Sequence, residues 1–175
     1  MKYIGIDPGS SGGVAYIDTE KNKHAAIKMP VIKSVFDLNE FSKIMRRLLS
    51  TDHHHVVMED VHSIFGMSAK SNFSFGKNVG NIEGVLASFS AKYTKVTPKV
   101  WQAEMWQGIN IVKINTGKKT KSGNVKYKTD TKATSLLAAK RLFPEDDFLA
   151  SERSSKPHDG IIDALLMAEY AKRKF

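Results

Sequence analysis

The chain has 175 residues, of which 41% are apolar and none is cysteine, and it carries a formal net charge of +9 at pH 7. This size fits one domain with one apolar core, and the lack of cysteine excludes disulfides, thiolate zinc sites and cysteine nucleophiles. No apolar run approaches the roughly 18 residues of a membrane span, and the N-terminus lacks a signal-peptide pattern. We expect a cytoplasmic protein of one domain, residues 1–175, with no membrane association and with a polyanionic partner.

The first 30 residues carry the pattern of three strands. In "KYIGID", Ile4 and Ile6 share one face, while Asp7 lies on the other. A glycine- and serine-rich corner leads to "GVAYID" (13–18), and "HAAIKMP" (24–30) follows a polar turn. The pattern predicts an antiparallel start to a mixed sheet.

Helices and strands alternate along the rest of the chain. Residues 38–48 place apolar side chains on one helical stripe, and Asp37 with Glu40 forms a capping-box start. Further elements are predicted as a strand at 53–61, a helix in the second half of 72–93, a short strand at 95–98 that runs into a helix at 98–106, and helices at 129–144 and 156–175. Glycines at 76, 80 and 84 would allow another element to approach the second of these helices closely. The order predicts an α/β fold.

The segment 113–132 is rich in lysine, glycine, threonine and asparagine and shows no apolar periodicity. It predicts a flexible loop that orders on a phosphate backbone, although a merely solvated loop would have the same composition. The lysines expected to contact such a backbone, whether of DNA or of another polyanion, are Lys113, Lys118, Lys119, Lys121, Lys126 and Lys128.

Acidic residues stand at the ends of two predicted strands and on the last helix. Asp7 ends the first strand; Glu59 and Asp60 end a later one, where only one of the two can share the buried face. Asp159 and Asp163 are four residues apart and so lie on one helical face. Asp163 is flanked by apolar residues, where an unpaired carboxylate is costly to bury.

Four carboxylates that meet in one pocket offer the oxygen ligands that Mg²⁺ or Mn²⁺ prefers. We expect two ions about 4 Å apart, which would activate a water and stabilise the leaving oxygen in phosphodiester hydrolysis. The ions would also let an acidic pocket in a basic protein bind a polyanion.

Several motifs follow one another along nearly the whole chain. They are "GIDPGSSGGVAYID", "VVMEDV", "GKNVGNIEGVL", "VTPKVWQ", "DTKATSLLAAKRLFP" and "HDGIIDALLMAEY". In this order they resemble the RuvC-type Holliday junction resolvases (crossover junction endodeoxyribonucleases), in particular the short phage-encoded and poxvirus-like members. The resemblance implies an RNase H-like fold with a mixed sheet flanked by helices. It also implies a homodimer and Mg²⁺- or Mn²⁺-dependent paired nicking of four-way DNA junctions in recombination and repair.

Carried over by position, the resemblance gives metal-binding and catalytic roles to Asp7, Glu59 and Asp163. Many bacterial members carry the fourth acid three residues before the last aspartate, where this chain has Gly160. We therefore expect Asp159 to be the fourth carboxylate.

Three further residues are accessory candidates. His158 precedes Asp159 and would either orient water or act as the ligand itself, and Asp60 and His62 follow the strand glutamate. Bacterial members place an aromatic residue near the position of His62; here Phe65, Phe73 and Phe75 come only later in the chain.

Three other interpretations stay open. The same fold would serve a nuclease for flaps, replication forks or RNA–DNA hybrids. The "DPGSSGG" corner is similar to the phosphate-binding turn of actin-like proteins and sugar kinases, but those have two lobes and repeat the motif, which occurs once here. A catalytically inactive DNA-binding module is the third. Trp101 and Trp106 are interpreted as core residues.

Overall fold

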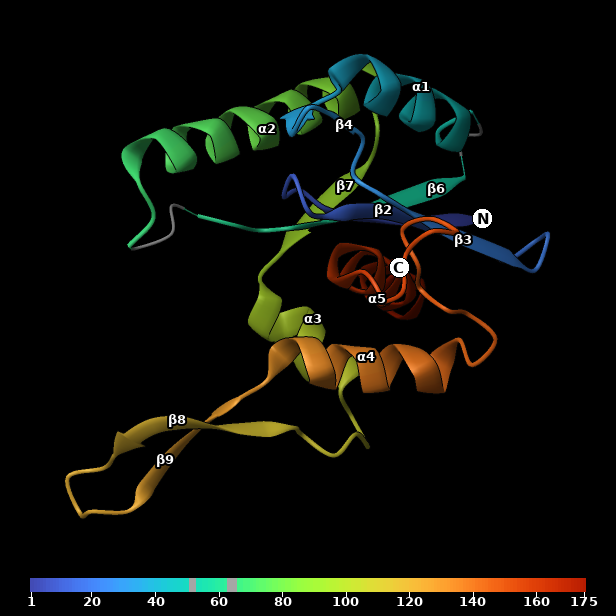
Figure 1. Cartoon of the computed structure of the whole chain (residues 1–175). Helices are drawn as coiled ribbons and strands as arrows, with labels where there is room; N and C mark the ends of the chain where they lie inside the picture. Colours follow the sequence, from blue (N-terminus) through green and yellow to red (C-terminus); the bar gives the residue numbers. More distant parts are fainter. Residues whose placement is uncertain (51–52, 63–65) are drawn as a thin grey trace.

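The computed structural model describes residues 1–50, 53–62 and 66–175 (Figure 1). The strands are β1 (Lys2–Asp7), β2 (Gly13–Asp18), β3 (Lys23–Lys28), β4 (Val31–Ile32), β5 (Val35–Phe36), β6 (His54–Glu59), β7 (Tyr93–Val96), β8 (Lys113–Lys119) and β9 (Val125–Thr129). The helices are α1 (Leu38–Leu48), α2 (Ala69–Ser88), α3 (Pro98–Met105), α4 (Thr131–Leu142) and α5 (Asp159–Lys174).

A five-stranded mixed sheet in the order β3-β2-β1-β6-β7 lies at the centre. β1, β2 and β3 pair antiparallel, whereas β6 runs parallel to β1 and β7 runs parallel to β6. The predicted mixed sheet with an antiparallel start is therefore confirmed. Because β1 and β6 are parallel neighbours, their last residues, Asp7 and Glu59, lie at the same edge of the sheet.

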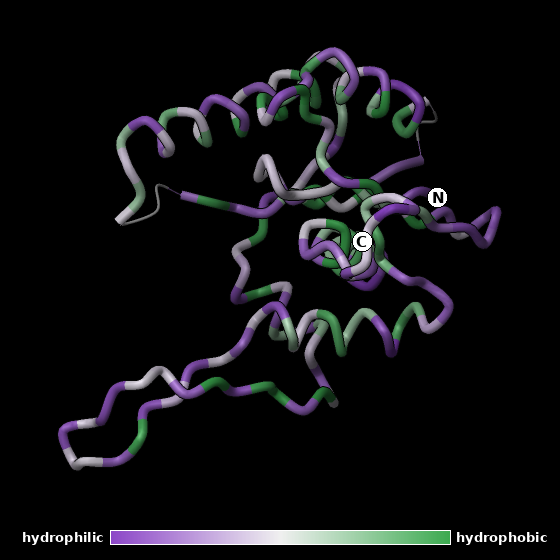
Figure 2. The backbone as a smooth tube through the Cα atoms, in the orientation of Figure 1, coloured by the Kyte–Doolittle hydropathy of each residue, from purple (hydrophilic) through white to green (hydrophobic). Residues whose placement is uncertain are grey.

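Helices cover both faces of the sheet (Figure 1). Ile4 and Ile6 of β1 pack with Phe41 of α1 and Leu86 of α2 in one buried cluster. On the opposite face α5 packs against the sheet, and α3 and α4 form a further layer beneath it. Hydrophobic and hydrophilic segments alternate along α1 and α4 in Figure 2, as expected for helices that bury one side. None of the described helices combines the length and the apolar character needed to cross a membrane.

Capping and proline signals locate the helix ends well. The Asp37 side chain accepts a hydrogen bond from the backbone N–H of Glu40 (3.0 Å), which confirms the predicted start of α1. The α4 helix ends before Pro144, as predicted, and α5 begins at Asp159 with His158 as its N-cap.

Helix α2 begins earlier than the sequence predicts. Only the second half of 72–93 was expected to be helical, but α2 already starts at Ala69. Ser68 explains the difference, because its side chain accepts a hydrogen bond from the backbone N–H of Ser71 (3.1 Å). The glycines at 76, 80 and 84 lie in open space, with no described protein atom within 4 Å of a Cβ built at any of them. No described element makes the predicted close approach to them.

Residues 113–132 are not the irregular loop that the sequence predicts. β8 and β9 pair antiparallel in a hairpin that projects from the body of the molecule, and Lys132 already belongs to α4 (Figure 1). The register shifts between Asn115 and Lys119, and Gly117 in this bulge has a φ of +71° that other residues rarely adopt. The segment is thus a regular element with an irregularity, not a loop.

Candidate active site

Asp7 stands at the end of β1, in a corner built from small residues. Gly9 donates its backbone N–H to Oδ1 of Asp7 (3.3 Å). Gly12 packs so closely on the backbone of Asp7 that a Cβ at Gly12 would overlap the Asp7 carbonyl. The corner therefore holds the Asp7 carboxylate at the edge of the sheet, with one oxygen already hydrogen-bonded.

β6 sends only one of its two terminal acids to this site. Burial, followed by the charge of Asp7, raises the pKa of Glu59, and Glu59 Oε1 accepts a hydrogen bond from the indole N–H of Trp101 (3.0 Å). Trp101 is fully buried, which confirms the prediction of a core residue, and it also orients the glutamate. Asp60 instead faces Lys95, with 3.6 Å between Oδ1 and Nζ. Strand alternation thus separates the two acids.

A glycine lets the N-terminus of α5 approach the corner. A Cβ on Gly160 would overlap the backbone of Ser11 and Gly12. No side chain therefore fits at position 160, three residues before Asp163. The acid expected near that position stands one residue earlier, at Asp159. Asp159 is half exposed at the mouth of the site, whereas Oδ1 of Asp163 is buried.

Burial and mutual repulsion raise the pKa values of three of the four acids. Burial is the main cause at Asp7, and the charge of Asp159 adds to it. Burial and the Asp7 charge raise the pKa of Glu59 to about 7. Burial, followed by the charge of Asp7, raises the pKa of Asp163 to about 7. The carboxylates therefore disfavour full ionisation in one another, which shows that β1, β6 and α5 bring them together.

Helix α4 adds a cation and a hydroxyl that the sequence did not assign to the site. Lys132 Nζ lies 2.5 Å from Asp159 Oδ2, and Asp159 is the main cause of the raised pKa of Lys132. Ser135, buried one turn later, lowers the pKa of Asp163. The sequence contained one signal for these two residues, namely their spacing, because residues 132 and 135 fall on one face of the predicted helix.

The two histidine candidates differ in their surroundings. His158 Nδ1 accepts a hydrogen bond from the backbone N–H of Ile161 (3.3 Å), so the neutral ring carries its proton on Nε2 and offers a donor there. The His62 side chain is 79% exposed, and its Nε2 lies 3.8 Å from Asp60 Oδ2, on the side of β6 away from Glu59. Phe65 lies outside the described residues.

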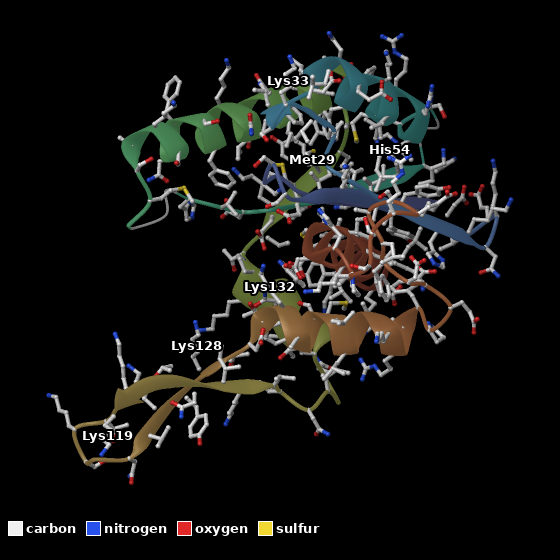
Figure 3. All side chains as sticks on the ribbon, in the orientation of Figure 1. Met29, Lys33, His54, Lys119, Lys128 and Lys132 are labelled. Carbon is white, nitrogen blue, oxygen red and sulfur yellow. The ribbon has the colours of Figure 1, made fainter. Side chains whose placement is uncertain are left out.

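The lysines expected to bind DNA lie on the β8–β9 hairpin, and all of them are exposed. They are Lys113, Lys118, Lys119, Lys121, Lys126 and Lys128. Figure 3 shows Lys119 near the tip, Lys128 further along β9 and Lys132 where α4 begins. Positive charge therefore extends from the tip of the hairpin to the carboxylates.

The donor set suits a hard divalent cation, although the ligand shell is not closed. Within residues 1–50, 53–62 and 66–175, no three acidic or histidine side chains are placed to hold one ion together. Asp163 Oδ1, however, is buried without a hydrogen-bond partner, which is unfavourable unless another group satisfies it. A cation beside Asp163 would supply that partner and relieve the repulsion among the acids. In charge and in ligand type the residues fit such an ion.

No protein-family model matches the sequence, and no curated protein matches it either. Among solved structures, Thermus thermophilus RuvC in complex with a Holliday junction substrate is similar with a TM-score of 0.53 at 14% identity, over 99% of this chain and 96% of that chain. Another Thermus thermophilus RuvC structure gives a TM-score of 0.49 at 18% identity with the same coverage. The ethanolamine utilization protein EutJ from Carboxydothermus hydrogenoformans gives 0.34 at 14% identity, over 81% of this chain and 57% of that chain.

The similarity to the RuvC–junction complex extends over the whole described arrangement of sheet and helices. Together with the five-stranded mixed sheet, it shows that the chain has the RNase H-like fold of RuvC, which confirms the predicted fold class. At 14% identity the similarity establishes the fold alone. The activity has to be argued from the site.

Proposed function

We propose that the chain is a metal-dependent endonuclease that cuts four-way (Holliday) or other branched DNA by paired phosphodiester hydrolysis, as a short RuvC-type resolvase of the phage or poxvirus kind. The observation that carries this proposal is the convergence of Asp7, Glu59 and Asp163 from three elements into one buried, mutually repelling cluster. The solved RuvC of similar fold is bound to a Holliday junction substrate, which supports branched DNA as the substrate class.

The side chains at this site would have different roles. Asp7, Glu59 and Asp163 would hold Mg²⁺ or Mn²⁺, and Asp159 would join them when Lys132 moves aside. When bound, one or two such ions supply an activated water and stabilise the leaving oxygen. The indole N–H of Trp101 holds the Glu59 carboxylate in place through Oε1, and the Nε2–H of His158 can hold a water near Asp159.

Two surfaces outside the cluster would engage DNA and a second copy. The exposed hairpin lysines would contact the phosphate backbone and neutralise its charge. A homodimer would bring two such centres to one junction, as paired nicking requires. We assign the dimer contact to the exposed side of α2, where Gly76, Gly80 and Gly84 leave room and Phe73 is 76% exposed. The enzyme would act in the cytoplasm.

A substrate panel tests the proposal. Purified protein is given a synthetic four-way junction, a flap, a fork, a linear duplex and an RNA–DNA hybrid, each with Mg²⁺ or Mn²⁺, beside the Asp7→Asn variant. We expect symmetric paired nicks in the junction and none by Asp7→Asn. Equal cutting of flaps, forks or hybrids would make the chain a broader nuclease on the same fold. The absence of metal-dependent cutting of any substrate would contradict the proposal.

A further inference from the structure

A polar groove of about 400 Å³ opens beside the corner that follows Asp7, on the side of the sheet covered by α1 and α2. The β4–β5 segment forms one wall and α2 forms the other, and Figure 1 shows these two elements next to each other. Ser10, in the corner itself, also lines the groove. The polar lining residues are Ser10, Ser34, Ser74, Lys77, Asn78 and Asn81.

The groove offers hydrogen-bond donors and a positive charge but no carboxylate. Within the described part of the chain, none of the six polar side chains hydrogen-bonds or ion-pairs with another protein group. Two acids that flank the lining segments in the sequence are already engaged. Asp37 caps α1 through Glu40, and Glu83 of α2 pairs with Lys95 (3.0 Å). A ligand in the groove would therefore meet hydroxyl and amide donors and the ammonium of Lys77, a set that suits an anion.

A second large cavity differs from this groove in the charge of its lining. It has a volume of about 390 Å³ and lies at the other end of β2, where the strand finishes at Asp18. Four acids line it, namely Asp18, Glu145, Asp146 and Glu169, against two lysines, Lys23 and Lys172, so the charge of its lining is net negative. Of the two cavities, only the groove beside α2 has the charge to receive a phosphate.

Ser10 connects the groove to the corner that follows Asp7. Ser10 follows Asp7 by three residues, so their Cα atoms are at most about 11 Å apart. That span corresponds to about three nucleotides at an axial rise of about 3.4 Å per nucleotide. On α2, positions 74, 77, 78 and 81 share one helical face and extend the polar lining. Figure 3 places Lys33 at the β4–β5 turn, next to Ser34 in the sequence, which adds a second cation near this wall.

We propose that this groove binds the phosphodiester backbone of the cleaved DNA strand, about one to three nucleotides from the phosphate that is cut. The inference rests on the proposed function, because the carboxylates define where that phosphate lies. Lys77 supplies the charge, and Ser10, Asn78 and Asn81 donate hydrogen bonds to the phosphate oxygens. The strand would thus be held on the α2 side of the corner as well as by the lysines on the hairpin side.

Single-phosphate neutralisation tests the proposal. Binding of a four-way junction is measured by fluorescence anisotropy over a range of salt concentrations, in the Asp7→Asn background so that no strand is cut. Each phosphate along one strand is replaced in turn by an uncharged methylphosphonate. We expect Lys77→Ala to weaken binding about 3- to 10-fold and to reduce the salt slope by about 1. At one position along the strand, the methylphosphonate should weaken DNA binding by the reference protein but leave binding by the Lys77→Ala variant unchanged. Binding by the double variant Asn78→Ala/Asn81→Ala should likewise become insensitive to a methylphosphonate at that position.

The control is Lys70→Ala, which removes an exposed lysine from the same helix outside the groove. Equal behaviour of Lys77→Ala and Lys70→Ala, or no phosphate whose effect depends on Lys77, would overturn the groove while leaving the nuclease intact. A Lys77-dependent phosphate in a protein that cuts nothing with metal would support the groove and contradict the proposed function. No junction binding at all would contradict both.

Discussion

The Asp163 carboxylate is buried and is repelled by neighbouring acids, and one of its oxygens has no hydrogen-bond partner. Its pKa of about 7 in the folded chain lies above the usual 3.8, so the folded state binds more protons than the unfolded state between these values. The free energy of unfolding of the metal-free protein therefore falls as the pH rises from about 4 to 7, and the loss persists above pH 7. Glu59 adds to this effect with the same sign.

We predict that Asp163→Asn stabilises the metal-free protein at pH 8, by on the order of 1–3 kcal/mol, because it removes the charge that the site disfavours. Urea unfolding at pH 5 and pH 8 measures the change. Glu152→Gln, which neutralises an exposed carboxylate in the loop before α5, serves as control and should change little. An unchanged pH dependence in Asp163→Asn would contradict the assigned repulsion.

Trp101 offers a second test at the residue scale. The Trp101→Phe change keeps an aromatic ring in the core but removes the N–H that lowers the pKa of Glu59. The pKa of Glu59 should therefore rise further, and the acidic limb of the cleavage pH profile should move to higher pH. Activity near pH 8.5 should approach that of the unchanged protein. A uniform loss of activity with an unmoved limb would show that Trp101 only packs.

The positions of the four acids along the chain indicate a shared site, which stays a prediction, whereas the partners of these acids could not be predicted. Asp7 and Glu59 end strands, and Asp159 and Asp163 share a helical face, which are local patterns. The hydrogen bond from Trp101 to Glu59 joins residues 42 positions apart, and the Lys132–Asp159 pair joins two helices. Such contacts follow only from the packing of α3, α4 and α5 against the sheet.

At the scale of elements, the β8–β9 hairpin is the clearest departure from the sequence prediction. Its apolar residues, Ile114, Val125 and Tyr127, are few and stand among lysine, threonine and asparagine, so no alternation is visible. The bulge at Asn115 to Lys119 shifts the register and hides the pairing further. The start of α2 was missed for a different reason, since Gly76 and Gly80 lower helix propensity while Ser68 supplies the cap.

The hairpin lysines are expected to set how strongly DNA binding depends on salt. Changing Lys118, Lys119 and Lys121 to alanine should weaken junction binding and reduce the slope of log K against log salt by about 2 to 3, because each phosphate contact contributes about 0.9. Fluorescence anisotropy at several salt concentrations measures both effects. Cleavage at saturating DNA should stay close to normal, since these lysines lie away from the carboxylates.

A matched triple variant controls for the loss of charge. Lys21, Lys23 and Lys92 are exposed lysines near the opposite end of the sheet from Asp7, and their change to alanine lowers the net charge equally. Binding that falls as much in this variant as in the hairpin variant would mean that overall charge, and not the hairpin, attracts the DNA.

For the molecule as a whole, the order of strands and helices along the chain predicts the fold, because the connections between successive strands are simple. A meander of three strands followed by β6 and β7 in parallel leaves α1 and α2 on one face and α5 on the other. The sequence alone does not reveal which helix faces stay uncovered. The glycines of α2 become a candidate contact only once the structure shows open space around them.

The proposed homodimer depends on the exposed side of α2. Gly80→Leu places bulk on the exposed side of α2 and should convert a homodimer into monomers, as measured by sedimentation equilibrium. Lys140→Leu adds a similar side chain on the exposed side of α4 and should leave the dimer intact. A protein that is monomeric before any change, with and without junction DNA, would contradict the proposed homodimer.

The most direct test of the central claim is Mn²⁺ binding by isothermal titration calorimetry, since it addresses the carboxylate cluster without any assumption about substrate. We predict saturable binding to the unchanged protein, and its loss in Asp7→Asn and Asp163→Asn while both variants stay folded by circular dichroism. Glu20→Gln, at the opposite end of the sheet and paired with the N-terminus, should bind Mn²⁺ normally. Equal binding in Asp163→Asn, or none in the unchanged protein, would contradict the claim that these acids form a metal site.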